Sequence, residues 1–184
     1  MKKIITASVV ALLSSGAVFA ENPTFDFVEA GYVDFDQLDG FSIRANASIS
    51  DNFFVNLGHE DISGSEAGVK EELDSTVVGL GIMGPISDAT SIFMHMDYVA
   101  FDTDNTSQNG WGLGAGIRSN VAENIELYGE VFYKDLDANH ENVELTGGVR
   151  FKASEQLGAY VEWTRLDQDD DDSDGFRVGV QYKF

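Results

Sequence analysis

From residue 25 to the last residue, apolar and polar residues alternate in repeated stretches of about ten residues. A two-residue period gives a β-strand one apolar face, and helical periodicity is absent from this part of the chain. The chain ends GFRVGVQYKF, in which apolar residues alternate with small or polar ones: Phe176, Val178, Val180, Tyr182 and Phe184. Chain ends usually fray, so an ordered aromatic end indicates that the last strand is required.

The alternation predicts strands at residues 25–33, 41–50, 53–60, 74–82, 91–100, 110–118, 125–134, 143–152, 157–166 and 175–184. The connections after the even-numbered strands are short turns, whereas those after the odd-numbered strands are expected to be longer, mostly acidic loops. Such sidedness is typical of a membrane β-barrel. An even number of strands also places both chain ends at the short-turn rim.

One face of the predicted strands is apolar, and the other carries charged residues and glycines, as in WGLGAGIR at residues 111–118. Glycine weakens a water-exposed strand, but inside a narrow barrel it leaves room for the long charged side chains of neighbouring strands. The aromatic residues of the apolar face form two bands, as at the two interfaces of a bilayer. One band is Tyr32, Phe41, Tyr98, Trp111, Tyr133, Trp163 and Phe176, and the other is Phe53, Phe151, Tyr182 and Phe184. The sequence predicts an all-β, transmembrane, antiparallel up-and-down barrel of about ten strands, with eight as the alternative count.

The first twenty residues have a different character. Lys2 and Lys3 are followed by an apolar run from Ile4 to Leu13, and small residues precede Glu21. The run is too short to cross a bilayer and is typical of a secretory signal peptide. We expect a cleaved signal peptide at residues 1–20 and a barrel domain at residues 21–184. Loss of the two lysines changes the formal net charge from −21 to −23, which disfavours nucleic acid as a partner.

With this leader, the opening strand FVEAGYV, WGLGAGIR and the terminal FRVGVQYKF, the sequence resembles the small outer-membrane β-barrel proteins of Gram-negative bacteria, the OmpA/OmpX-like and porin-like group. The resemblance implies an outer-membrane location, with lipid and lipopolysaccharide around the barrel. It also implies that the barrel assembly machinery reads the alternating C-terminus, here Val178, Val180, Tyr182 and Phe184. It leaves the activity open, because one barrel fold hosts many functions.

The predicted inward face carries charges of both signs, which we call the lumen ladder. Its members are Glu29, Arg44, Glu60, Asp97, Arg118, Glu126, Glu130, Lys134, Glu144, Arg150, Lys152, Glu162, Arg177 and Lys183. Neighbours of opposite sign are expected to pair, because an unpaired charge in a narrow interior is costly. These charges fit a structural filling of the lumen by paired side chains. The alternative is that the ladder lines a narrow path for cations.

The predicted loops are acidic, most of all near the end of the chain. Asp170, Asp172, Asp174 and Gly175 match the opening of a calcium loop, but Gln181 stands where such a loop needs glutamate. No cofactor is expected, and the three aspartates are left only as weak candidates for loosely bound Ca²⁺ or Mg²⁺. A solvated, repulsive outer rim is the favoured explanation of the acidity, because acidic runs are commonly just that.

An enzyme is not expected. His95 and Asp97 share the inward face with Ser91, but no known motif of barrel enzymes accompanies them. His59 is predicted to face lipid, and His140 to lie in a loop. The sequence therefore predicts a barrel with a filled polar lumen and acidic extracellular loops, in a structural or surface-interaction role with an unknown surface partner. A narrow, cation-preferring channel is the alternative.

Overall fold

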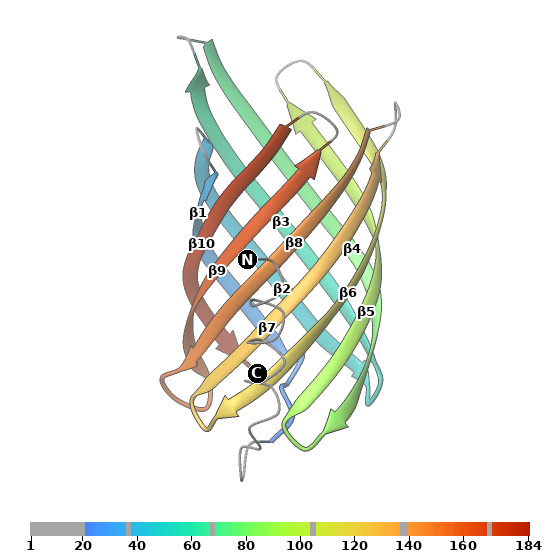
Figure 1. Ribbon diagram of the computed structural model, residues 1–184, viewed down its shortest axis with the longest axis vertical. Helices are drawn as coiled ribbons and strands as arrows, with labels where there is room; N and C mark the ends of the chain where they lie inside the picture. The colour runs from blue at the N-terminus through green and yellow to red at the C-terminus, as the bar shows by residue number, and fades with distance from the viewer. Residues whose placement is uncertain (1–20, 36–37, 67–68, 104–105, 137–139, 169–170) are drawn as a thin grey trace, which may run out of the picture.

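The computed structural model describes residues 21–35, 38–66, 69–103, 106–136, 140–168 and 171–184, which form one closed, all-antiparallel barrel (Figure 1). Its strands are β1 (Phe27–Phe35), β2 (Leu38–Ser50), β3 (Phe53–Glu66), β4 (Val69–Ser87), β5 (Thr90–Thr103), β6 (Ser107–Ala122), β7 (Ile125–Leu136), β8 (His140–Lys152), β9 (Leu157–Gln168) and β10 (Asp171–Lys183). The predicted fold class is confirmed, with ten strands and not eight. The predicted signal peptide lies outside the described residues. Within the described ranges, no helix has the length and apolar character needed to span a membrane.

The barrel closes between its first and last strands. β1 pairs with β10 from Phe27 opposite Lys183 to Phe35 opposite Gly175, and pairs with β2 along its other edge. The N–H of Phe184 also donates to the carbonyl oxygen of Asp26 at 3.4 Å. The last strand is therefore ordered because it closes the barrel and leaves no unpaired sheet edge.

Side chains alternate between the outside and the lumen along every strand. The outward apolar side chains stay exposed, as with Phe41 at 71%, Leu80 at 62% and Val180 at 62%. Aromatic side chains of both predicted bands are among those that remain exposed, including Tyr98 and Trp111 in one and Phe151 and Phe184 in the other. The outside of the barrel is therefore an apolar belt between two aromatic girdles.

The strands extend further than predicted on the side opposite the short turns. β3 ends at Glu66 and β4 begins at Val69, so this connection is short and most of the predicted acidic loop belongs to the strands. The expectation of longer loops after the odd strands is thus wrong. The prediction ended each strand where apolar residues stopped alternating, but antiparallel hydrogen bonding continues through polar residues beyond the belt. Of the acidic residues assigned to loops, Asp36, Asp104, Asp137, Asp169 and Asp170 lie outside the described residues.

The lumen is not polar throughout. Three apolar clusters line it: Phe25, Phe54 and Phe93 near the short turns, Val33, Phe35 and Ile62 on β1 and β3, and Val99, Phe132 and Leu136 on β5 and β7. The prediction of a polar lumen missed these clusters. Where an apolar side chain also points into the lumen, both faces of the strand are apolar. The alternation between apolar and polar residues is then weaker, and the pattern does not reveal the cluster.

Candidate functional site

All fourteen members of the lumen ladder lie on the inward faces of their strands. Seven are carboxylates, Glu29, Glu60, Asp97, Glu126, Glu130, Glu144 and Glu162, and seven are basic, Arg44, Arg118, Lys134, Arg150, Lys152, Arg177 and Lys183. Their formal charges cancel, so the net charge of −21 for the whole chain arises from residues outside the ladder. The ladder is therefore electrically balanced inside a strongly acidic protein.

The ladder is centred on Glu29 of β1, which is 1% exposed. Its carboxylate accepts from Arg44 on β2 at 2.9 Å, from Gln181 on β10 at 2.9 Å and from Arg150 on β8 at 2.6 Å. The guanidinium of Arg150 also donates to Glu126 on β7 at 2.8 Å. The bond between Glu29 and Arg150 joins β1 to β8, which are not neighbours in the barrel wall, so it braces the lumen from the inside.

A second centre is Glu162 of β9, also 1% exposed. Arg44 contacts both of its oxygens, at 3.1 and 2.9 Å, and the hydroxyl of Tyr128 donates to it at 2.5 Å. Arg177 joins Glu162 to Glu60 on β3. Because buried carboxylates are costly when unpaired, this set of contacts compensates the burial of Glu162 inside the barrel.

Arg118 extends the same network toward the short turns. Its Nε donates to Glu126 at 2.8 Å, and the Nζ of Lys183 lies 3.7 Å from the other oxygen of that carboxylate. Near the opposite end, Lys134 pairs with Glu144 at 2.7 Å. Lys152 lies inward at the short-turn end and is partly buried.

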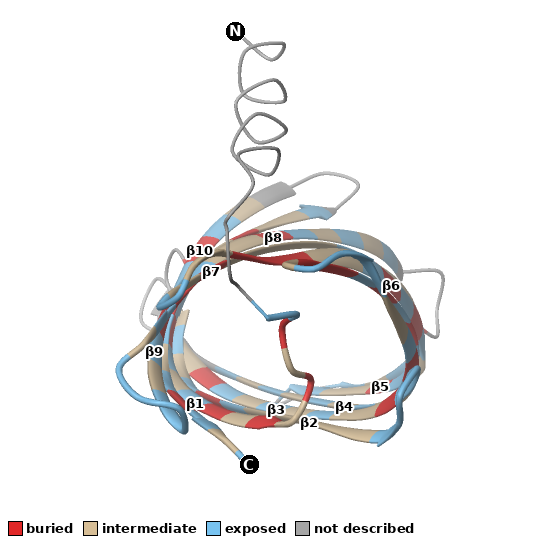
Figure 2. Ribbon diagram, turned by 90° about the horizontal axis from the view of Figure 1, so that it is seen from below, coloured by how far each residue is buried: buried red, intermediate tan, exposed pale blue. Residues whose placement is uncertain are grey.

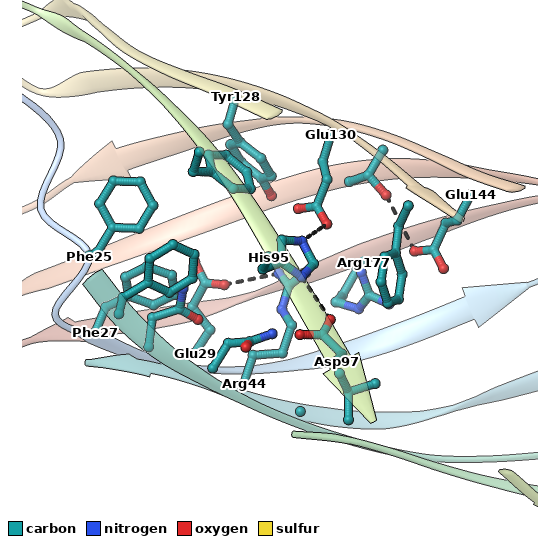
Figure 3. A pocket seen from close by; sticks show the side chains of 18 of the residues that line it. Phe25, Phe27, Glu29, Arg44, His95, Asp97, Tyr128, Glu130, Glu144 and Arg177 are labelled. Carbon is teal, nitrogen blue, oxygen red and sulfur yellow. Dashed lines mark hydrogen bonds and ion pairs between the residues drawn. The ribbon is translucent and has the colours of Figure 1, made fainter. Parts of the chain in front are cut away.

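His95 of β5 bridges two carboxylates. Its Nδ1 lies 2.7 Å from Asp97, and its Nε2 lies 2.8 Å from Glu130 on β7 (Figure 3). Hydrogen bonds to two carboxylates suit a ring that donates from both nitrogens. Ser91 instead contacts Asn22 at 3.2 Å, so the described contacts do not assemble the three residues into a catalytic triad.

Three glycines of β6 lie beneath a row of rings. A Cβ at Gly112, Gly114 or Gly116 would overlap Phe132, His95 or Phe93, respectively. The ring centroids of Phe93 and His95 are 6.0 Å apart, and those of His95 and Phe132 are 5.2 Å apart. On this strand glycine makes room mainly for rings, whereas the sequence had suggested long charged side chains.

Between the ring row and the ladder lies a hollow of about 170 Å³. Arg44, Arg150 and Arg177 line its charged side, while Phe54 and Phe93 line its aromatic side. A space of this size with polar walls holds several water molecules. Figure 3 shows Glu29, Arg44 and His95 facing this hollow.

Sequence reasoning missed Tyr128 and Gln181, two neutral inward side chains that donate hydrogen bonds to Glu162 and Glu29 of the ladder. Both occupy inward positions of the two-residue period, so the period itself could have found them. The assembly-signal residues Val178, Val180, Tyr182 and Phe184 all face outward and are exposed.

Of the weak metal candidates, Asp170 lies outside the described residues, and nothing is described of the side chain of Asp172. Asp174 is exposed and lies 3.9 Å from Arg165. Within the described part of the chain, no group of three or more His, Cys, Asp or Glu side chains is placed to hold a metal ion. His59 is on the outer face, as predicted, and its Nδ1 lies 3.0 Å from the hydroxyl of Thr76. The side chain of His140 is not described.

No protein-family model matches the sequence, and no curated protein matches it. Solved structures match in fold. A KdgM porin in complex with disordered oligogalacturonate is 15% identical, with 86% of this chain and 99% of that chain covered and a TM-score of 0.54. A NanC porin is 8% identical, with the same coverage and a TM-score of 0.58. At such identities the likeness shows a shared barrel fold, and that fold is the one used by porins.

Proposed function

We propose that this protein is a porin-type barrel of a Gram-negative outer membrane, exported through a cleaved signal peptide, whose narrow lumen passes water and small cations. The apolar belt supports the membrane location, because a soluble protein rarely exposes a continuous apolar surface. The fold shared with KdgM and NanC porins supports the channel type.

The hollow inside the lumen is the observation that carries the channel proposal. A ladder that filled the barrel completely would leave no path, but here about 170 Å³ of space remains among the side chains of the lumen. Lumens of barrels near eight strands are normally filled by side chains, whereas barrels of sixteen or more strands hold open channels. A ten-stranded barrel with a small hollow fits a path for ions and not for oligosaccharides.

The charge distribution favours cations. The ladder is neutral as a whole, so the lumen itself carries no strong preference. The outward faces beyond the belt carry exposed carboxylates, and a mouth lined by one sign of charge raises the local concentration of the opposite ion. The arginines of the ladder are engaged by glutamates, which leaves them poorly available to a polyanion such as the oligogalacturonate of the KdgM structure.

The test is a current measurement on the refolded protein, starting at Glu21, in a planar bilayer with unequal salt on the two sides. A heat-modifiable shift on a gel verifies that the barrel is folded. The proposal expects small, discrete current steps. It also expects a reversal potential that is shifted toward the equilibrium potential of the cation. Liposomes containing the protein should not swell in oligosaccharide solutions that enter through large porins.

A second candidate, a surface-interaction role, is favoured by the carboxylates just beyond the belt. In the strand register Asp34 is opposite Asp39, and Asp74 lies between Asp61 and Asp102. Like charges directly opposite each other are destabilising, so bridging by Ca²⁺ or Mg²⁺ to lipopolysaccharide phosphates would relieve them. Calorimetry with lipopolysaccharide, with and without calcium, tests this role. The assembly machinery is proposed as the partner of the outward C-terminal residues.

A further inference from the structure

The stretch Glu21–Asp26, which precedes β1, turns into the short-turn mouth of the barrel (Figure 2). We call it the plug segment. Pro23 and Phe25 are buried, although neither belongs to a strand. The prediction began the first strand at residue 25, but β1 begins at Phe27. The segment therefore lies outside the strands and is held in the mouth by side-chain contacts and a few hydrogen bonds, one of them from the N–H of Phe184 to the carbonyl oxygen of Asp26.

Phe25 lies at the centre of these contacts. Its ring centroid is 5.0 Å from that of Phe54 on β3 and 5.7 Å from that of Phe93 on β5. The guanidinium of Arg118 on β6 lies over the ring of Phe25, 4.6 Å from its centroid. Aromatic and cation–π contacts of this kind stabilise a ring in a fixed place. Phe25 is 3% exposed as a result.

Polar contacts fix the two ends of the segment to different parts of the rim. At one end, the side-chain amide of Asn120 on β6 donates to the carbonyl oxygen of Glu21. The amide of Asn22, with its nitrogen turned to the β4–β5 turn, donates to the carbonyl of Ser87 at 3.0 Å. At the other end, Asp26 accepts from the backbone N–H of Ser48 on β2 at 2.6 Å. The segment thus crosses the mouth from β6 to β2.

We infer that the plug segment closes the short-turn mouth and that the ring of Phe25 blocks the opening. Release of the segment from the mouth sets how much current the barrel carries. This inference rests on the proposed channel function. Phe25 and Arg118 line the hollow at this end, so the segment lies in the path that an ion would take. One ring and a few hydrogen bonds hold it, and the pairing of β1 with β2 and β10 begins after it, at Phe27. The segment can therefore leave the mouth without unfolding the barrel.

Phe25→Ala tests the inference in the refolded protein in a planar bilayer. The matched control is Phe53→Ala at the same rim, where the ring is 52% exposed on the outer face. Loss of the Phe25 ring should raise the mean current several-fold over both the wild type and the control. Equal currents in all three proteins would overturn the plug and leave the channel standing. If all three fold and carry no current, the channel proposal fails.

A cross-link tests the position of the plug segment in the mouth independently of current. The chain has no cysteine, so Asn22→Cys with Ser91→Cys introduces one defined pair where the native polar atoms lie 3.2 Å apart. Oxidation of the folded double variant should form a disulfide, seen as a mass loss of two hydrogens, and should suppress current that reduction restores. No disulfide in the folded barrel would overturn the plug, whatever the current.

Discussion

Arg150 on β8 and Glu29 on β1 meet inside the lumen, with the Nε of the arginine 2.6 Å from a carboxylate oxygen of the glutamate. β9 and β10 separate these two strands in the barrel wall. The two side chains are 5% and 1% exposed, so little water screens the pair. The contact therefore ties together parts of the wall that backbone pairing does not join.

Arg150→Ala should destabilise the barrel by about 3–5 kcal/mol, because it leaves Glu29 and Glu126 without a shared partner in a buried site. The measurement is the loss of the heat-modifiable gel band as the temperature rises. Arg165→Ala is the matched control on the outer surface, where an exposed arginine contributes about 0–1 kcal/mol. Equal transitions for the two variants would show that the ladder does not brace the barrel.

Removing Arg118 and Arg150 together should also widen the lumen. Two guanidinium groups beside the hollow are replaced by methyl groups, so the single-channel conductance of Arg118→Ala with Arg150→Ala should exceed that of the wild type. Recording both proteins in the same bilayer and salt provides the comparison. A folded double variant with unchanged conductance would contradict a lumen narrowed by these arginines.

Gly114→Leu should displace His95 and destabilise the barrel, because even a Cβ at this position overlaps the imidazole ring. The contact of His95 with Glu130 would be lost with it. Gly147→Leu is the control, since nothing lies within 4 Å of a Cβ there. Urea unfolding in lipid vesicles measures both. We expect a lower midpoint for Gly114→Leu alone, and a matching fall in the control would argue against ring packing as the cause.

Leu80→Arg should cost about 2–4 kcal/mol if the outer face contacts hydrocarbon, since that is the cost of arginine on the lipid face of a barrel. Asp74→Arg adds the same side chain to the same strand beyond the belt, between Asp61 and Asp102, and should cost nothing. Folding yields in lipid vesicles separate the two variants. Similar yields would contradict the membrane belt.

Phe184→Ala should reduce assembly in cells and leave refolding in detergent nearly unchanged. The ring is 63% exposed on the outside, so its loss removes little internal packing. The amount of folded barrel in outer-membrane fractions is the measurement, with Phe151→Ala as the control at the same rim. Equal cellular amounts would show that the terminal ring is not a recognition signal.

The number of strands, their faces and the aromatic girdles could be predicted from the sequence because a closed barrel with an apolar outside imposes a two-residue period on every strand. The strand ends on the side opposite the short turns could not be predicted, because beyond the belt the backbone still pairs while the side chains become polar. β4, for example, runs from Val69 to Ser87, well beyond the predicted residues 74–82.

The inward positions of the ladder also follow from the period, but its partners do not. Arg44 reaches Glu162 and Arg150 reaches Glu29 only because the barrel closes on ten strands with a particular stagger. The place of Phe25 was equally hidden, since it continues the alternation of Phe27 and Glu29 without continuing the strand. The stagger at which the barrel closes and the path of the plug segment depend on contacts between distant parts of the chain, which a local sequence pattern does not contain.

Ion current through the refolded protein, measured beside the Phe25→Ala variant under a salt gradient, tests the channel most directly. We predict small, discrete, cation-preferring steps from the wild type and a several-fold larger mean current from the variant. Folded wild-type and variant barrels that both remain silent would contradict the channel, and the lumen ladder would then be a permanent structural filling.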